Sequence, residues 1–230
     1  MVKSDEEDGK AYVEKKFNRL NKNTLRHDIY DQLRQSIITG DLLPGESITL
    51  RNIAEQFGVS IMPVREALWQ LESENIIVIE SNRSIRVNSL SAEEMEEALS
   101  IRIMLEAEAA RLACERRPDS AIPEVEHLLS ALIKSIKQPK KYMDNNSKYH
   151  FAIYSYSKAP LLLGIINGLW ARVGPYFIIH ANDLEDLYHT ISYHQKMFDG
   201  FVNRDKKKIA EAIREDLENA ARLIKPKLGS

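Results

Sequence analysis

The sequence predicts a mainly α-helical protein in which an N-terminal winged helix-turn-helix is followed by an antiparallel all-helical bundle of about six helices. Two short amphipathic helical patterns joined by a glycine lie between residues 42 and 71, two short β-branched runs follow them, and only helical patterns follow residue 88. We expect a mobile polar tail at 1–23, a winged helix at 24–89 and a helical domain at 90–230.

The segment 42–71 carries the helix-turn-helix pattern. Thr49 is a candidate N-cap for the first short helix, and Gly58 stands where the chain leaves that helix, a position that often needs a positive φ. Ser60 can cap the second helix, whose inward apolar residues repeat every three or four positions. In this geometry the first turn of the second helix enters the major groove of DNA. Arg65 is then the first candidate for a base contact, because its guanidinium can donate two hydrogen bonds to guanine.

A leading helix precedes this motif and a wing follows it. Residues at helical spacing predict a helix that ends near Gly40; they are Leu25, Ile29, Leu33 and Ile37. The β-branched runs at 76–80 and 85–88 predict a hairpin with a cationic tip. Three helices and a hairpin form a winged helix.

Three stretches then resemble the GntR family of bacterial transcription regulators: IITGDLLPGE at 37–46, RNIAEQFGVS at 51–60 and PVREAL at 63–68. In that family the residues that match Arg51, Ser60 and Arg65 contact operator DNA, so the resemblance implies these roles here.

We add neighbours of these residues to the expected DNA-binding set: Met62 in the first turn of the second helix, and Asn82 and Arg83 at the wing tip. Arg83 and Arg86 are expected to touch phosphate, which positions a protein without reading sequence. Two departures from the family matter: Ile61 replaces a residue that is basic in many members, and Ser84 replaces the usual wing glycine. The operator sequence therefore cannot be taken from relatives.

The second half resembles the all-helical C-terminal domain of the FadR branch of that family. A capping box at Ser91 and Glu94 opens a long helix, and further helices are expected at about 121–137, 139–157, 160–181, 183–202 and 205–225. The arrangement from Arg102 through Glu106 to 111–113 resembles the first helix of that domain, and His194 followed by Asp205 resembles its last two.

In many members of that branch an Asp and three His hold a divalent metal. The equivalents here are Asn146, His150, His194 and Asp216, of which only the two His match. An Asn oxygen is a poor zinc ligand, so no cofactor is assigned, and the sequence favours core histidines over a metal such as zinc.

A polar pocket inside the bundle could bind a small carboxylate or other anion. Its candidate residues are Arg102, Tyr154, Arg172 and Tyr193. The alternative for the arginines is an ion pair with a helix neighbour, and for the tyrosines ordinary packing with the hydroxyl at the rim.

Composition sets wider bounds. The net charge of -2 does not indicate nucleic acid, so the case for DNA rests on individual cations. One cysteine, Cys114, cannot form an intrachain disulfide, and no secretory or membrane-spanning segment is visible, which favours a cytoplasmic protein without a membrane partner. GxSxG, HExxH, Walker A and GxGxxG signatures are absent, so we do not expect an enzyme.

The expected function is that of a regulator that binds double-stranded DNA at a palindromic site as a homodimer, with a small-molecule effector in the helical domain. Two alternatives remain. The first is a helical metal- or ligand-binding protein, and the second is a protein-interaction module with a degenerate winged helix.

Overall fold

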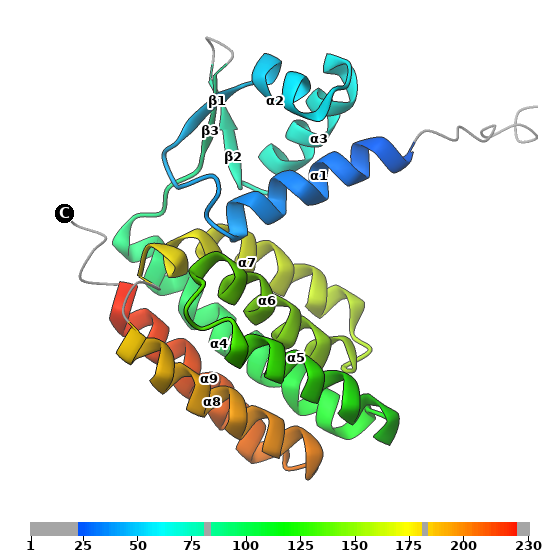
Figure 1. Cartoon of the computed structure of the whole chain (residues 1–230), viewed down its shortest axis with the longest axis vertical. Helices are drawn as coiled ribbons and strands as arrows, with labels where there is room; N and C mark the ends of the chain where they lie inside the picture. Colours follow the sequence, from blue (N-terminus) through cyan, green and yellow to red (C-terminus); the bar gives the residue numbers. More distant parts are fainter. Residues whose placement is uncertain (1–22, 81–83, 181–183, 225–230) are drawn as a thin grey trace, which may run out of the picture.

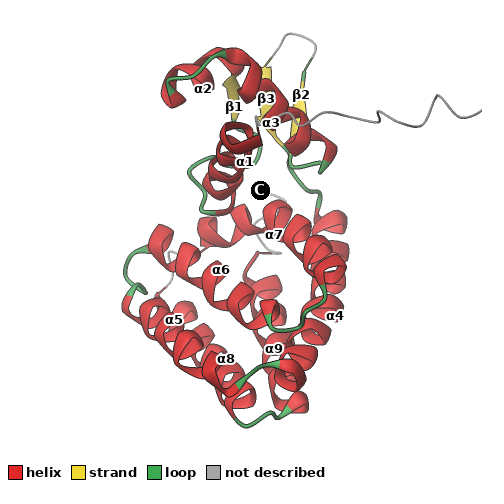
Figure 2. Cartoon of the chain, turned by 90° about the vertical axis from the view of Figure 1, so that its right-hand side faces the viewer, coloured by secondary structure: helices red, strands yellow, loops and turns green. Residues whose placement is uncertain are grey.

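A computed structural model of the chain describes residues 23–80, 84–180 and 184–224 (Figure 1). A small domain of three helices and a sheet lies on one end of a larger helical bundle, and the view at 90° shows the same division (Figure 2). In chain order the elements are α1 Asn23–Ile38, β1 Ser47–Thr49, α2 Leu50–Phe57, α3 Ile61–Ser73, β2 Ile77–Ile79, β3 Ser84–Val87, α4 Ala92–Arg116, a 3₁₀ turn Asp119–Ala121, α5 Ile122–Lys134, α6 Pro139–Ser155, α7 Pro160–His180, α8 Leu184–Val202 and α9 Lys206–Ile224.

The ends of α2 follow from its capping residues. Thr49 accepts a hydrogen bond from the backbone N–H of Asn52 at 3.2 Å, as its N-cap position predicts. Gly58 has φ +65°, which a residue with a Cβ adopts only at a cost, so the chain can leave α2 and turn into α3. Ser60 lies at the N-cap of α3, as predicted, but its side chain makes no capping hydrogen bond. The prediction is therefore right about the position and wrong about the hydrogen bond.

The sheet has three strands in the order β1-β3-β2, all antiparallel. The sequence predicted only the hairpin of β2 and β3. Strand β1 was missed because three residues are too few to show an alternating pattern. Its pairing of Ser47 with Arg86 and Thr49 with Ser84 ties the segment before α2 to the wing.

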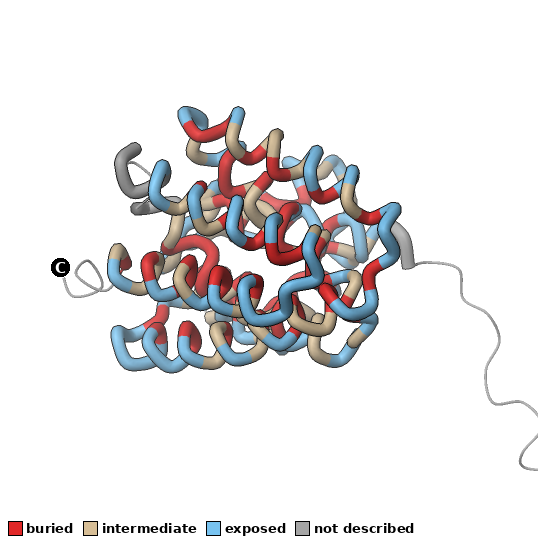
Figure 3. The backbone as a smooth tube through the Cα atoms, turned by 90° about the horizontal axis from the view of Figure 1, so that it is seen from below, coloured by how far each residue is buried: buried red, intermediate tan, exposed pale blue. Residues whose placement is uncertain are grey.

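The second part of the described chain contains helices only, as predicted. The capping box at Ser91 and Glu94 opens α4, which packs mainly against α9, while α8 packs along α9. Seen from below, the buried segments lie mainly on the sides of the helices that face other helices (Figure 3). Of the helices in the described ranges, none has the length and apolar character needed to cross a membrane.

Helix α7 joins the two parts. Ala171 belongs to the hydrophobic core of the small domain, although it lies in the bundle sequence, and a Cβ placed on Gly174 would lie 3.4 Å from Ile38 Cγ2. Arg34 of α1 donates to the carbonyl oxygen of Asn167 in α7. Trp69 of α3, a large side chain that packing at this contact would bury, is instead 54% exposed.

Polar contacts from α6 reinforce the same interface. Gln35 Nε2 donates to Asp144 Oδ1 at 3.1 Å, and Lys140 forms an ion pair with Asp41. The two domains are therefore linked by hydrogen bonds, an ion pair and a shared apolar core.

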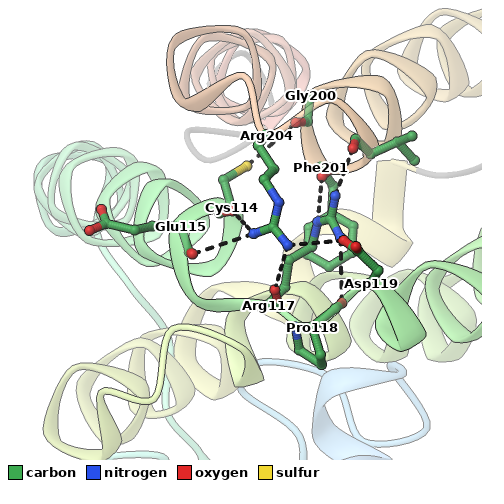
Figure 4. A network of polar contacts seen from close by, with 9 residues as sticks. Cys114, Glu115, Arg117, Pro118, Asp119, Gly200, Phe201 and Arg204 are labelled. Atoms are coloured by element: carbon green, nitrogen blue, oxygen red, sulfur yellow. Dashed lines mark hydrogen bonds and ion pairs between the residues drawn. The ribbon is translucent and has the colours of Figure 1, made fainter.

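Two arginines close the far end of the bundle (Figure 4). Arg117, just after α4, donates to the carbonyl oxygens of the last two residues of α8, Phe201 at 2.7 Å and Val202 at 2.6 Å. Arg204, between α8 and α9, donates in return to the carbonyl oxygens of Cys114 and Arg117 at 3.1 and 2.9 Å. Each guanidinium thus satisfies carbonyls that a helix end leaves without an intrahelical partner.

Candidate DNA-reading surface and bundle cavity

The start of α3 presents the predicted DNA-binding residues to solvent. Arg65 is exposed, because the buried face of α3 is formed by other residues, including Val64 and Leu68. Met62 is 54% exposed, and the Ser60 hydroxyl makes no bond to the helix it precedes. The first turn of α3 therefore offers a cation, an apolar side chain and a hydroxyl on one accessible end.

Arg51, at the start of α2, has an exposed side chain that pairs with Glu55 at 2.9 Å. A solvent-exposed pair of this kind is worth only about 0–1 kcal/mol, so a DNA phosphate can replace Glu55 as the partner.

The wing is described only at its two strands. Asn82 and Arg83 lie outside the described residues. Ser84 donates its hydroxyl to Glu80 at 2.6 Å, and Arg86 forms a 2.9 Å ion pair with the same carboxylate. Glu80 is therefore the partner of Arg86 in this structure, an ion pair that the sequence did not predict.

Inside the bundle the four residues of the incomplete ligand set come together. Nε2 of His150 lies 3.0 Å from Nε2 of His194 and 3.6 Å from Oδ2 of Asp216. Oδ1 of Asn146 lies 2.8 Å from Nε2 of His194. Helices α6, α8 and α9 each contribute to this histidine cluster, which we define as Asn146, His150, His194 and Asp216.

The charge states of the cluster follow from its burial. Both imidazoles are inaccessible to solvent, and burial lowers the pKa of His194 to about 4 and that of His150 well below its usual value. Burial also raises the pKa of Asp216 to about 7, although the charge of Arg102 opposes the shift. At neutral pH the histidines are therefore uncharged, which is the form that binds a metal.

The cluster fits a divalent cation. Candidate ligand atoms of His150, His194 and Asp216 all lie within 4.8 Å of one another, and Asn146 adds an amide oxygen. Two imidazoles and two oxygen donors suit metals such as zinc or nickel, with the amide oxygen as the weak ligand.

A cavity borders this cluster. The space between its lining residues amounts to ≈ 610 Å³ when the open solvent at its mouth is included. Its polar lining includes Arg102, Asn146 and Asp216. Its apolar lining comes from one residue of α6 and from α7 and α9, and consists of Met143, Trp170, Phe177, Leu217, Ala220, Leu223 and Ile224.

Three buried donors on the cavity wall lack a hydrogen-bond partner among the described residues. They are Nη1 of Arg102, the hydroxyl of Tyr142 and Nε1 of Trp170. Leaving such groups unpaired in the interior costs free energy, on the order of 1–3 kcal/mol each. A bound group with acceptor oxygens would satisfy them.

The expected pocket residues have different places. Arg102 lines the cavity and also pairs with Glu106 at 2.6 Å, so the helix-neighbour alternative holds for it as well. Tyr154 is fully buried beside the cluster, where its oxygen lies 2.9 Å from Nδ1 of His150. Arg172 lines a small pocket at the domain contact instead, and the ring of Tyr193 lies 5.3 Å from Nζ of Lys196.

The sequence reading missed Tyr142 and Trp170 as cavity residues. Trp170 precedes Arg172 by two positions, which places the two about 200° apart around a helix at 100° per residue. To choose Trp170 over Arg172, one must know which face of α7 points into the bundle. The sequence alone does not show this, because most of α7 is apolar.

Comparison with known proteins identifies both parts of the chain. Residues 25–87 match the profile described as bacterial regulatory proteins, gntR family, and residues 97–219 match the FCD domain. The chain is 31% identical to the HTH-type transcriptional regulator McbR of Escherichia coli over 176 residues, covering 74% of this chain and 80% of that protein. It is 26% identical to the HTH-type transcriptional repressor GlaR of the same species, covering 83% and 91%.

A solved structure of E. coli McbR/YncC superposes with a TM-score of 0.84 at 26% identity, covering 89% of this chain and 98% of that one. Both domains and their order thus have counterparts in proteins named as transcriptional regulators, which are not enzymes. The chain belongs to the GntR family of bacterial DNA-binding transcriptional regulators, in the FadR branch that carries an FCD domain.

Proposed function

We propose that this regulator binds a palindromic operator as a homodimer and that a small anionic effector in the bundle cavity changes its affinity for that operator. The observation that carries the effector half is the set of three unpaired buried donors on the wall of a largely apolar cavity. A carboxylate on an apolar body is complementary to such a wall, because its oxygens accept from the donors and its body replaces water.

A dimer is needed because one winged helix reads only a few base pairs. Two α3 helices separated by one turn of DNA, roughly 34 Å, would read an inverted repeat in the bacterial cytoplasm. Apolar side chains on the bundle surface support a subunit contact: Leu161 and Ile165, one turn apart on α7, are 86% and 57% exposed.

The DNA-binding unit we propose spans residues 24–89, with Arg65 and Arg51 as its principal contacts. Arg65 is the base-reading residue, Ser60 and Met62 flank it, and Arg51 binds phosphate or a base edge nearby. Asn82 and Arg83 complete the proposal at the wing.

Helix α7 gives the effector a route to the DNA-binding domain. Trp170 and Phe177 line the cavity, whereas Ala171 and Asn167 contact the small domain. An effector that shifts α7 toward one of two positions would change the orientation of α1, and with it the spacing of the two α3 helices.

The histidine cluster would hold a divalent cation at the inner edge of the cavity through His150, His194, Asp216 and Asn146. When bound, the cation would supply a Lewis-acidic positive charge that attracts an effector oxygen. Arg102 would bind the same anion from α4, and Tyr142 and Trp170 would orient it.

Selection of genomic fragments by the purified protein tests the DNA proposal. We expect fragments that contain an inverted repeat, a stoichiometry of two chains per site by native mass spectrometry, and affinity that falls steeply with salt. Arg65→Ala should lose much of the preference among fragments, because one base contact is worth about 1–3 kcal/mol of discrimination. Arg111→Ala is the control, since Arg111 pairs with Glu108 in the bundle. If Arg65→Ala keeps the preference, the assignment of Arg65 is wrong.

The effector proposal is tested by adding carboxylates of increasing apolar size, from acetate to decanoate and including benzoate, to the selected DNA complex. We expect at least one to change the Kd for DNA. Trp170→Phe removes one donor and keeps a ring. It should weaken the binding of that carboxylate by about 1–3 kcal/mol, the cost of an unmade buried hydrogen bond. A carboxylate that binds Trp170→Phe with unchanged affinity would contradict this placement.

A further inference from the structure

A buried chain of hydrogen bonds leads from α4 into the histidine cluster. Glu106 is fully buried, and its carboxylate accepts a hydrogen bond from Nε of Arg102 at 2.6 Å. The hydroxyl of Tyr154 donates to the other carboxylate oxygen of Glu106 at 2.8 Å. Because a carboxylate paired with a guanidinium can only accept, the single proton of the Tyr154 hydroxyl is committed to Glu106.

The donation from Tyr154 to Glu106 fixes the tautomer of His150. The oxygen of Tyr154 lies 2.9 Å from Nδ1 of His150, and it has no second proton to give. Nδ1 of His150 must therefore be the donor in this contact. A neutral imidazole carries one N–H, so Nε2 of His150 is left as a bare lone pair.

His194 reaches the same state by a separate contact. Its Nδ1 lies 2.9 Å from the carbonyl oxygen of Thr190, and a carbonyl can only accept. Nδ1 of His194 thus carries its proton, and Nε2 is bare. The two bare nitrogens lie 3.0 Å apart, next to Asp216 and to the amide of Asn146.

We propose that Arg102, Glu106 and Tyr154 are positioning residues that hold His150 in its Nδ1–H tautomer, so that four acceptor atoms meet at one point and select a cation. This inference rests on the metal site proposed above. Without a cation, the two lone pairs repel each other, and the donors that can enter the cluster are the Asn146 amide, turned by 180°, and Asp216 when it is protonated. With a cation, the same four groups are all ligands. Partners of ligating histidines commonly act in this way.

The direction of donation along these hydrogen bonds decides which nitrogen of His150 carries the proton. If Tyr154 donated to His150 instead, Nε2 would carry the proton and a hydrogen would point into the cluster. Glu106→Gln can produce that reversal, because the Gln amide can donate to the Tyr154 oxygen. Tyr154→Phe removes the link and leaves the tautomer of His150 undetermined by α4.

The test measures the tautomers directly. The protein is labelled with ¹⁵N-histidine, freed of metal with EDTA and examined at pH 8 by two-bond ¹H–¹⁵N correlation spectra. In the wild type we expect both His150 and His194 to show protonated Nδ1 and bare Nε2. A wild-type spectrum with protonated Nε2 on His150 overturns the inference, and this measurement needs no variant to fold.

Variants and zinc titration complete the test. Tyr154→Phe and Glu106→Gln should shift His150 toward protonated Nε2 and lower the affinity for Zn²⁺ alone by about 10–100-fold. Tyr156→Phe is the matched control, since its hydroxyl donates to Glu124 at 2.5 Å, away from the histidines, and it should change neither readout. Unchanged tautomer and unchanged zinc affinity in Tyr154→Phe would also refute the proposal.

Failure of the metal site is a separate result. If the wild type shows the expected tautomers but binds no Zn²⁺ in the titration, the proposed cation site is wrong and the tautomer assignment stands. If zinc binds but His150 has protonated Nε2 in the metal-free protein, the site stands and the role of Arg102, Glu106 and Tyr154 is wrong.

Discussion

Gly200 in α8 should be intolerant of a single methyl group. A Cβ added there would lie 2.8 Å from the backbone nitrogen and 2.9 Å from the Cβ of Ile209 in α9. Contacts this short require one of the helices to shift. The arginine contacts of Figure 4 oppose such a shift, because they fix the carbonyl oxygens of Phe201 and Val202 at the end of α8.

The magnitude follows from two opposing terms. Replacing glycine by alanine in a helix interior is worth about 1 kcal/mol in favour of alanine. Overpacking costs about 1–3 kcal/mol, and a clash with backbone belongs at the upper end of that range. We therefore expect Gly200→Ala to lower the free energy of unfolding by about 2 kcal/mol, the difference between the two terms.

Two glycines of α7 are the matched controls. A Cβ on Gly164 or Gly168 would meet no atom of the same chain within 4 Å, so within one subunit only the favourable term applies. Gly164→Ala and Gly168→Ala should each raise the free energy of unfolding by up to about 1 kcal/mol.

Urea unfolding monitored by circular dichroism and by fluorescence measures these changes. A Trp69→Phe background leaves Trp170, which is buried in the bundle, as the only tryptophan. If Gly200→Ala is as stable as the parent, or if all three alanine variants shift in the same direction, the close approach of α8 and α9 is not as described.

Other predictions concern the cluster, the wing, a helix end and the cysteine. Asn146→Asp should tighten Zn²⁺ binding at least tenfold, about 1.4 kcal/mol, because a carboxylate replaces a neutral amide oxygen; isothermal titration with EDTA-treated protein measures this. Arg86→Ala should weaken binding to all DNA fragments by a similar small factor, since the free protein already pairs Arg86 with Glu80; gel shifts on specific and random fragments show whether preference is kept. Ser91→Ala should cost about 1 kcal/mol of stability in urea unfolding through loss of the α4 cap. Burial raises the pKa of the Cys114 thiol to about 11, so the thiolate fraction stays small below pH 9; alkylation by iodoacetamide should be slow in the native protein and fast in urea, and rapid native labelling would contradict the burial.

The helix-turn-helix could be predicted because its signals are local. Capping by Thr49, the left-handed Gly58 and the apolar spacing within α3 all act within a few residues of each other. The short strand β1 could not, because it exists only through pairing with β3. A three-residue strand has no pattern of its own.

The cavity could be predicted only in part. The histidine cluster was identified residue by residue through a family resemblance, and the structure places its four members within contact of one another. The assignment of Arg172 failed because a mostly apolar helix does not show which of its faces points inward. Burial of the Arg102 and Glu106 pair was equally hidden, since an i,i+4 pair of charges is typical of an exposed helix face.

The contribution of Ala171 to the core of the small domain has a consequence for evolution and for engineering. A gene fusion that replaces residues 24–89 with the corresponding piece of a relative would set a foreign surface against Ala171, Gly174 and Asn167. Such a hybrid would fold well only if its new leading helix offered an apolar side chain in the place of Ile38, against Gly174, and a cation in the place of Arg34, beside Asn167. DNA preference and effector preference in this protein are therefore expected to be inherited together, and chimeras designed to recombine them should carry the middle of α7 along with the N-terminal segment.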